Sequence, residues 1–232
     1  MFFILIKTVL LLPFLIVCSI YDRSKQKLRL YGIYGFFGLP GKGKTMAMSY
    51  YLDQMRKKYK DKIYIMTNYF YKDQDFVFNS WKDLLKDYDK PLIVAWDEVQ
   101  NEFNSRDFKD FPIELLTLLT QVRKENGIQL LYTAQRWHFV DKNFRSLSFG
   151  CYECTTKLGR YTIAKMYDPI DYDNLCGEND YDKRRKIRPK KYMDFIQTKK
   201  LRDCYDSYKM LKSAKTKEYM SREEVAKSER IL

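Results

Sequence analysis

The chain has 232 residues, which is enough to bury one core of ordinary size and to carry an appendage. Its 43 Lys and Arg outnumber its 30 Asp and Glu, and the net charge of +13 suits a polyanionic partner or an acidic membrane surface. Five scattered cysteines, an odd number, argue against a small secreted domain held by disulfides. We therefore expect one globular core in a reducing compartment.

Residues 2–21 form an apolar stretch that only Lys7 interrupts. Its length, about 20 residues, is what a helix needs to cross a bilayer. A cleaved signal peptide is the alternative, but no small-x-small cleavage site follows. The flanking cations, which place the rest of the chain in the cytoplasm, are Arg23, Lys25, Lys27 and Arg29. The sequence thus predicts a transmembrane anchor at 1–22 and a single-pass protein of the inner (cytoplasmic) membrane of a bacterial host.

The run GLPGKGKT, residues 38–45, matches the pattern G-x-x-x-x-G-K-[ST] and follows a β-rich segment at 30–37. Glycines let backbone amides turn toward phosphate oxygens, and the start of a following helix adds partial positive charge. Lys44 supplies a full charge, and Thr45 supplies a hydroxyl for Mg²⁺. The predicted nucleotide-binding residues are Gly38, Leu39, Pro40, Gly41, Lys42, Gly43, Lys44, Thr45 and Met46.

A helix is predicted directly after this loop, because apolar residues recur there at helical spacing. They are Ala47, Met48, Tyr51, Leu52, Met55 and Tyr59. The strand, loop and helix that the motif requires are therefore all present. We expect a site for ATP and Mg²⁺ in an α/β fold, a P-loop NTPase core with a mainly parallel sheet.

A predicted strand at 63–66 precedes the run PLIVAWDEV, which has the composition of a strand buried on both faces and ends in two carboxylates. We expect this acidic strand to lie beside the loop strand. Asp97 would then reach Mg²⁺, and Glu98 would take a proton from the attacking water. A pair of solvated acids at the end of a strand is the alternative.

A helix is predicted to begin near Phe111, with Pro112 in its first turn, and to end at Gly127. The apolar run at 128–132 is the next predicted strand, and Gln135 follows it. Because the carboxyl ends of parallel strands converge, the Gln135 amide would sense the γ-phosphate. A turn or capping role for Gln135 is the alternative.

Two β-rich runs between residues 151 and 167 predict a hairpin at the sheet edge, with its turn at Gly159. The first run contains Cys151 and Cys154 as a C-x-x-C. An odd spacing sends two side chains to opposite faces of a strand, which argues against a shared zinc ion. The hairpin closes the predicted ATPase domain at residue 168.

Residues 169–232 are predicted to form a charged linker and a helical tail. An acidic stretch there lacks the glycine of an EF-hand loop, so calcium binding is not expected. The basic run at 183–191 would contact DNA phosphates or acidic lipid, or would be a solvated linker. A surface helix is predicted at 199–212, and Ser221 with Glu224 would cap a last short helix.

The motifs GLPGKGKT, IVAWDE, QVRKENG and LLYTAQ, followed by VDKNFRSL, resemble the zonular occludens toxin family of filamentous-phage assembly ATPases over about residues 30–150. That family is similar to the HerA/FtsK branch of DNA-pumping ATPases. The resemblance implies an ATPase domain at 28–168 that forms a homo-oligomeric ring and drives DNA packaging, extrusion or phage assembly. Single-stranded DNA, or a phage or plasmid nucleoprotein, would be its partner. More specific markers are Thr67 with Asn68, Arg123, and Gln135 with Asp141 and Arg145.

The resemblance assigns phosphate and magnesium to Lys44 and Thr45, hydrolysis to Asp97 and Glu98, and phosphate sensing to Gln135. Three residues are candidates for an arginine finger that reaches a neighbouring subunit, namely Arg123, Arg136 and Arg145. Of these, Arg145 is the one predicted to be catalytic. In that family we would expect the membrane span after the ATPase core, whereas here the apolar segment comes first. No toxin-like outer domain is therefore expected.

The strongest alternative is a nucleotide-switched membrane scaffold or partner-recruiting protein, in which ATP binding orders loops without DNA translocation. Abundant Tyr and Phe among cations would suit a single-stranded DNA channel, but an AT-rich genome would enrich the same residues. A GTPase is disfavoured because the sequence has no N-K-x-D motif. An ABC transporter subunit is disfavoured because nothing resembles its signature loop.

Overall fold

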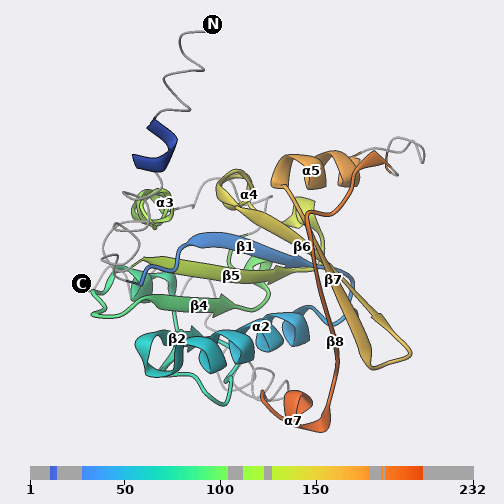
Figure 1. Ribbon diagram of the computed structural model, residues 1–232, viewed down its shortest axis with the longest axis horizontal. Coiled ribbons are helices and arrows are strands. Elements are labelled where there is room, and N and C mark those ends of the chain that lie inside the picture. Colours follow the sequence, from blue (N-terminus) through green and yellow to red (C-terminus); the bar gives the residue numbers. More distant parts are fainter. Residues whose placement is uncertain are drawn as a thin grey trace, which may run out of the picture.

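The computed structural model describes residues 11–14, 28–103, 112–122, 127–177, 184 and 186–205. These residues form a twisted eight-stranded sheet with helices on both faces (Figure 1). The strand order is β3-β2-β4-β5-β1-β6-β7-β8. Neighbouring strands from β3 to β6 run parallel, and β7 and β8 continue the sheet antiparallel. The predicted α/β fold with a mainly parallel sheet is confirmed.

The strands are β1 (Gly32–Phe37), β2 (Tyr64–Thr67), β3 (Phe76–Val77), β4 (Leu92–Trp96), β5 (Ile128–Ala134), β6 (Gly150–Lys157), β7 (Tyr161–Tyr167) and β8 (Lys191–Ile196). The α-helices are α2 (Lys44–Tyr59), α3 (Ile113–Thr120), α4 (Lys142–Leu147), α5 (Pro169–Gly177) and α7 (Lys199–Arg202). Short 3₁₀ turns are η1 (Lys60–Lys62), η2 (Trp81–Leu85), η3 (Val99–Asn101) and η4 (Trp137–Phe139).

β5 lies between the loop strand β1 and the acidic strand β4. The prediction that β1 and β4 are neighbours is therefore wrong. β5 is parallel to both strands, pairing with β1 along Gly32–Phe37 and with β4 along Leu92–Trp96. Because all three strands point the same way, their carboxyl ends still meet at one edge of the sheet. That edge carries the phosphate-binding motif, Asp97 and Gln135.

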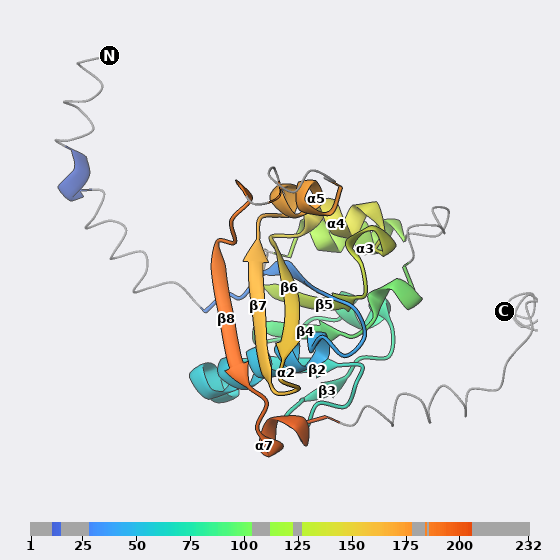
Figure 2. The same cartoon turned by 90° about the vertical axis from the view of Figure 1, so that its right-hand side faces the viewer.

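The two faces of the sheet are covered by different helices (Figures 1 and 2). Under α2, Met48 packs with Phe36 of β1 in a core that α7 also joins. On the other face, Leu115 of α3, Phe144 of α4 and Tyr172 of α5 belong to a second core. All these side chains are at most 5% exposed. The central strands are thus buried on both sides, which accounts for their unbroken apolar runs.

Cys151 and Cys154 of β6 point to opposite faces, as the sequence predicted. Cys151 belongs to the core under α3, α4 and α5, and Cys154 belongs to the core under α2. Burial raises the pKa of both thiols, that of Cys154 to about 12. Both therefore stay protonated at neutral pH and serve as small apolar packing groups.

β8 was not predicted, because residues 169–232 were assigned to a charged linker and tail. It pairs with β7, and its Phe195 stacks on Tyr50 of α2 with ring centroids 4.2 Å apart. The β6–β7 hairpin is therefore not at the sheet edge, which corrects that prediction. The domain boundary proposed at residue 168 falls between two strands of one sheet.

Other element boundaries differ by a few residues. Pro112 is the N-cap of α3, with ψ of 130°, and is not part of its first turn. α7 ends at Arg202, and the predicted helix at 199–212 is described only to residue 205. Phe111, Arg123 and the last predicted helix, with its Ser221 cap, lie outside the described residues.

The prediction of a single-pass inner-membrane protein is corrected here. Within residues 11–14, 28–103, 112–122, 127–177 and 184–205 as far as they are described, no helix is long and apolar enough to span a bilayer. A span needs about 20 mostly apolar residues. The longest helix in these ranges, α2, has 16 residues and ends in three cations. Of the predicted anchor at 1–22, only residues 11–14 are described.

Candidate nucleotide-binding site

The loop of residues 38–43, called here the phosphate loop, joins the carboxyl end of β1 to α2 (Figure 1). Gly38 and Gly43 adopt φ angles of 151° and 84°, which glycine reaches without strain. Gly43 is the N-cap of α2, and no side chain caps the helix there. The amides of the first turn are therefore left for another acceptor, which suits an anion at the positive end of the helix.

The β6–β7 hairpin supports both ends of the phosphate loop. A Cβ atom at Gly38 would lie 2.9 Å from the carbonyl oxygen of Cys154 on β6. A Cβ atom at Gly43 would lie 2.6 Å from Thr156 Oγ1, two residues further along β6. Cβ atoms in real proteins essentially never lie so close to another atom. Only glycine therefore allows the loop to contact the hairpin at these two points.

Lys44 is enclosed by this loop, and its side chain is only 7% exposed. Its Nζ atom donates a hydrogen bond of 3.4 Å to the carbonyl oxygen of Leu39. In the part of the chain that the structure describes, no carboxylate lies within ion-pair distance of this ammonium group. A buried positive charge without an anionic partner is costly, so the arrangement suits a ligand that brings negative charge into the loop.

The remaining loop residues differ in exposure. Leu39, Pro40, Gly41 and Lys42 are exposed, and the Lys42 amide donates to the Leu39 carbonyl to close a turn. The side chain of Met46 packs in the core under α2 and is 7% exposed, so its predicted place in the nucleotide site stays a prediction that concerns its backbone. The side chain of Met46 therefore contributes to the position of the helix.

Thr45 and Asp97 meet at the carboxyl edge of the sheet. Thr45 Oγ1 lies 3.0 and 3.2 Å from the two carboxylate oxygens of Asp97. Thr133, from the end of β5, also donates a hydrogen bond of 2.6 Å to Asp97 Oδ1. The Asp97 backbone is held by Asn68, whose side chain accepts from Asp97 N at 2.8 Å and donates to Asp97 O at 3.0 Å. Asp97 is thereby fixed from β2, β5 and α2 at once.

Burial raises the pKa of the Asp97 carboxyl above its ordinary value. The hydrogen bonds from Thr133 and Thr45 oppose this rise, the nearby negative charge of Glu98 adds to it, and the positive charge of Lys44 opposes it. The net direction means that the folded protein favours the protonated form more than an exposed aspartate does. A cation bound at this carboxylate would offset the free-energy cost of burying its negative charge.

Glu98 adopts a left-handed conformation, with φ of 56° and ψ of 52°. A non-glycine residue in this region is strained, and such residues concentrate at functional sites. The Glu98 amide donates to Thr133 Oγ1 at 2.8 Å, and its carboxylate accepts from Asn101 at 3.2 Å. Thr133 therefore connects the two acids, because its hydroxyl donates to Asp97 and accepts from the Glu98 backbone.

Gln135 and the phosphate loop line the same cavity, which has a volume of about 380 Å³. The loop contributes Gly38, Leu39 and Lys42, and Glu153 of β6 forms another wall. Gln135 is half-buried directly after β5. The structure thus brings the predicted sensor and the phosphate loop to one hollow.

Arg145, the predicted catalytic arginine, lies in α4 and makes contacts within the chain. Its Nη1 atom is 3.2 Å from Asp173 Oδ1 of α5, and its Nε atom donates to the Val140 carbonyl at 3.2 Å. The guanidinium carbon lies 5.6 Å from the ring centroid of Trp137. These contacts tie α4 to α5, and the catalytic role of Arg145 stays a prediction. The other described finger candidate, Arg136, is exposed over the ring of Phe139.

Thr133 has no predicted role, and Asn68 is predicted only as a marker of the resemblance. Both residues are polar and lie at the carboxyl ends of buried parallel strands, a position that local sequence does mark. Their partners could not be inferred, because the contacts of Thr133 with Asp97 depend on β5 lying next to β4.

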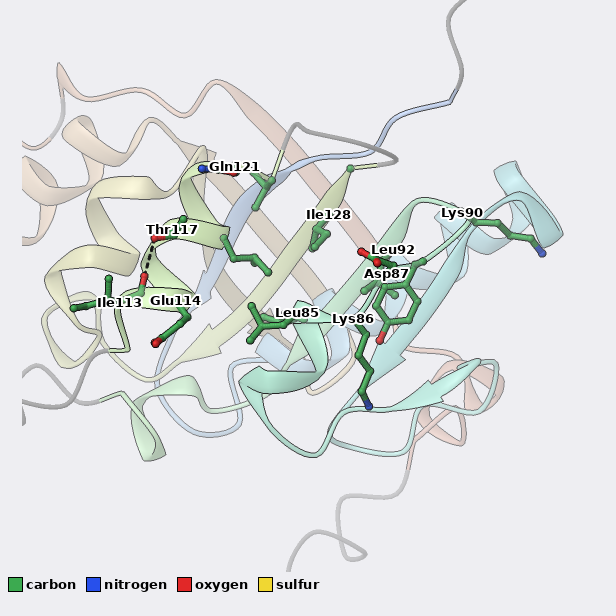
Figure 3. Close-up of a pocket in the computed structure, with 15 residues that line it drawn as sticks. Leu85, Lys86, Asp87, Lys90, Leu92, Ile113, Glu114, Thr117, Gln121 and Ile128 are labelled. Atoms are coloured by element: carbon green, nitrogen blue, oxygen red, sulfur yellow. Dashed lines mark hydrogen bonds between the residues drawn. The ribbon is translucent and has the colours of Figure 1, made fainter. Parts of the chain in front are cut away.

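A second cavity, of about 480 Å³, lies at the other end of the sheet (Figure 3). Its walls come from α3, residues 84–90 and the beginnings of β4 and β5, where Leu92 and Ile128 are found. Glu114 and Lys86 lie at its rim (Figure 3). None of the predicted site residues lines this cavity, so it is separate from the phosphate loop.

Comparisons with known proteins give structural matches only. No protein-family model and no curated protein matches this sequence. The N-terminal domain of zonular occludens toxin from Neisseria meningitidis superposes with a TM-score of 0.51 at 20% identity, covering 76% of this chain and 100% of that chain. The genome packaging NTPase B204 of Sulfolobus turreted icosahedral virus 2, in complex with AMPPCP, has a TM-score of 0.45 at 12% identity, with coverage of 60% and 93%.

The ATPase domain of G40P has a TM-score of 0.42 at 8% identity, covering 67% of this chain and 89% of that chain. At such scores and identities the likeness concerns the fold alone, and of these three structures the toxin domain alone has a TM-score above 0.5. The chain therefore has the fold of the N-terminal domain of zonular occludens toxin, in agreement with the resemblance seen in its motifs.

Proposed function

We propose that this chain binds ATP with Mg²⁺ in the phosphate loop and hydrolyses it. One observation carries the proposal: the loop encloses the ammonium group of Lys44 while Thr45, the next residue, contacts Asp97 from β4. A triphosphate would provide the anion that Lys44 needs. The complete match of residues 38–45 to the phosphate-binding pattern supports the same ligand.

Mg²⁺ fits the donor atoms at this edge of the sheet. The Thr45 hydroxyl and the Asp97 carboxylate are hard oxygen ligands. A bound cation would also offset the free-energy cost of burying the ionised Asp97 carboxylate. Thr45 and Asp97 would hold the ion directly or through water. When bound, Mg²⁺ supplies positive charge that stabilises the phosphate oxygens.

Glu98 is the proposed general base. Asp97 is held by the hydroxyl groups of Thr45 and Thr133, whereas Glu98 has only Asn101 as the described partner of its carboxylate. Glu98 would accept a proton from a water molecule as that water attacks the γ-phosphorus. The bond from the γ-phosphorus to the bridging oxygen breaks, and ADP leaves with that oxygen. Two neighbouring carboxylates in different surroundings can do different work.

Gln135 is proposed to contact the γ-phosphate, since it shares a cavity with the phosphate loop. Its amide would distinguish ATP from ADP and would transmit that difference to the segment at 136–140 that follows it. We propose the predicted limits of 28–168 for the nucleotide-binding part, with β8 as a further strand of the same sheet and α7 packed beside it.

We further propose that hydrolysis drives DNA packaging, DNA extrusion or phage assembly by a homo-oligomer. The support is the motif resemblance, the fold shared with the toxin domain and the net charge of +13, which suits a nucleic acid partner. Single-stranded DNA or a phage or plasmid nucleoprotein is the proposed cargo.

The test is phosphate release from ATP by the full chain, with and without single-stranded DNA at low salt, beside Lys44→Ala and Glu98→Gln. We expect turnover that DNA stimulates, and loss of turnover in both variants. Equal rates in all three proteins would contradict the ATPase assignment. Real turnover that is indifferent to DNA would instead favour a nucleotide-switched, partner-recruiting protein, because phosphate contacts are strongest at low salt.

A further inference from the structure

The amino end of α2 rests on two threonines of the β6–β7 hairpin. Thr156 and Thr162 are cross-strand partners, and their hydroxyl oxygens lie 2.9 Å apart. A Cβ atom at Gly43 would lie 2.6 Å from Thr156 Oγ1 and 3.1 Å from Thr162 Oγ1. The pair of hydroxyl groups is therefore in direct contact with the last glycine of the phosphate loop.

Gln197, which follows β8, makes hydrogen bonds to both of these hydroxyl groups. Its Nε2 atom donates to Thr162 Oγ1 at 2.8 Å and reaches Thr156 Oγ1 at 3.5 Å. Thr162 is fully buried, and Gln197 is 7% exposed. Buried amide and hydroxyl groups must be hydrogen-bonded to be tolerated, so this contact fixes the orientation of both side chains.

The other end of Gln197 is fixed by α7. Gln197 Oε1 accepts hydrogen bonds from Arg202 Nε at 3.2 Å and from Arg202 Nη2 at 3.1 Å. Arg202 also donates to the carbonyl oxygen of Gly159 in the hairpin turn at 2.6 Å. α7 and this turn lie at the same end of the sheet (Figure 2). A chain of hydrogen bonds thus leads from α7 to Thr162 and Thr156, which lie against Gly43 of the phosphate loop.

Packing alone does not require polar groups behind Gly43. Valine has the shape of threonine and methionine has about the length of glutamine, so apolar side chains could fill the same space. The polar groups instead impose direction, because a hydrogen-bonded hydroxyl pair has one preferred geometry while apolar contacts have many. The Gly43 peptide is the point at which the loop turns into α2, and its amide is one of those that would face a phosphate.

We infer that Gln197 is a positioning residue for the phosphate loop and acts through Thr162 and Thr156. The inference rests on the proposed nucleotide site and adds a determinant to it from outside the motif. The hydrogen bonds hold the hairpin against Gly43 and thereby keep the loop amides directed at the β-phosphate. Nucleotide affinity then depends on a residue of the segment after β8, far from the motif in sequence.

The test uses the full chain and compares Gln197→Met and Thr162→Val with Thr162→Ser, which keeps the hydroxyl. Gln129→Met is the matched control, since Gln129 is also buried and accepts a hydrogen bond from Tyr51 at 3.0 Å. Gln129 lies at the amino end of β5, away from the phosphate loop. The measurements are the Kd of Mg-ATP, the separate kcat and KM of hydrolysis, and the Tm without nucleotide.

We expect Gln197→Met and Thr162→Val to raise Kd and KM by about fivefold or more with a smaller change in kcat, as for loss of a buried hydrogen bond. Thr162→Ser should retain wild-type Kd, and Gln129→Met should lower Tm without raising Kd. Unchanged Kd in Gln197→Met and Thr162→Val, or an equal rise in Gln129→Met, would overturn the inference while leaving the proposed function intact. Absence of ATP binding by the wild type would overturn the proposed function itself.

If Gln197→Met does not fold, the comparison of Thr162→Val with Thr162→Ser tests the inference by itself. Thr162→Val replaces the hydroxyl group by a methyl group, and Thr162→Ser removes only the methyl group, so each variant changes one group at a fully buried position. A rise in Kd for the valine variant but not for the serine variant supports positioning by the hydroxyl. Equal Kd values in the two variants contradict it.

Discussion

Thr133 Oγ1 donates a hydrogen bond of 2.6 Å to Asp97 Oδ1, across the junction of β5 and β4. The same hydroxyl accepts from the amide of Glu98 at 2.8 Å. One side chain thereby sets the orientation of both acids that we assign to metal binding and base catalysis. Its placement is a direct result of the strand order, because β5 separates β4 from the phosphate loop.

Replacing Thr133 by valine keeps the shape of the side chain and removes both hydrogen bonds. We expect kcat for ATP hydrolysis to fall by about tenfold or more, the usual effect of losing a hydrogen bond to a charged group. The Kd of ATP should change little, because Lys44 and the loop amides are untouched. Steady-state kinetics together with equilibrium titration check this. A Kd that rises as much as kcat falls would mean that Thr133 acts on binding.

Asp97→Asn should stabilise the nucleotide-free protein while removing Mg²⁺-dependent hydrolysis. Burial raises the pKa of Asp97, so its ionised form costs stability at neutral pH, and a neutral amide avoids that cost. A gain of about 1 kcal/mol would raise Tm by about 2–4 °C for a chain of this size. Thermal unfolding without nucleotide measures it. A lower Tm for the variant would show that the Asp97 carboxylate stabilises the fold.

The same pKa shift gives the Tm difference a pH dependence of definite sign. A carboxyl whose pKa is raised in the folded state favours folding in its protonated form. That contribution is fully present below the pKa of the unfolded chain, about 3.9, and is lost as pH rises through the folded-state value. The Tm advantage of Asp97→Asn over wild type should therefore shrink as pH is lowered from about 7 toward about 4. A constant or growing difference would refute the assignment of the shift to Asp97.

Arg145 and Asp173 should behave as a structural pair. We expect Arg145→Ala and Asp173→Ala each to lower the stability by about 1 kcal/mol or less, because the pair is partly exposed. The double variant should lose less than the sum of the two, since the residues share a contact. Turnover at a temperature where all variants are folded is the second readout. A far larger drop in kcat for Arg145→Ala than for Asp173→Ala would restore Arg145 as an arginine finger.

Local sequence patterns predicted much of the sheet. The buried strands β4 and β5 and the helix α2 follow from apolar runs and helical spacing, and the glycines with Lys44 and Thr45 follow from a motif of fixed length. These features depend on neighbours in sequence, which is why they could be read directly. The opposite orientation of Cys151 and Cys154 followed from strand geometry in the same way.

Features that depend on distant partners were missed or misplaced. The insertion of β5 between β1 and β4 is a choice of strand order, which no local pattern contains. β8 is an edge strand with the sequence KYMDFI, and Phe195 is its only buried residue. Its lysine and aspartate interrupt the apolar pattern that would have predicted a strand. Met46 lies next to the motif in sequence, yet helix geometry turns its side chain into the core. Likewise, the link from Gln197 to Gly43 arises only once β8 has joined the sheet.

The proposed function requires that the phosphate loop binds a triphosphate together with a metal ion at Thr45 and Asp97. Calorimetric titration of ATP into the full chain, with Mg²⁺ and with a chelator, tests it most directly beside Lys44→Ala. We predict saturable binding to wild type that weakens by about tenfold or more when Mg²⁺ is removed or when Lys44 loses its charge, a loss typical of charge-assisted contacts. No measurable binding, or the same Kd in all three cases, would contradict the claim.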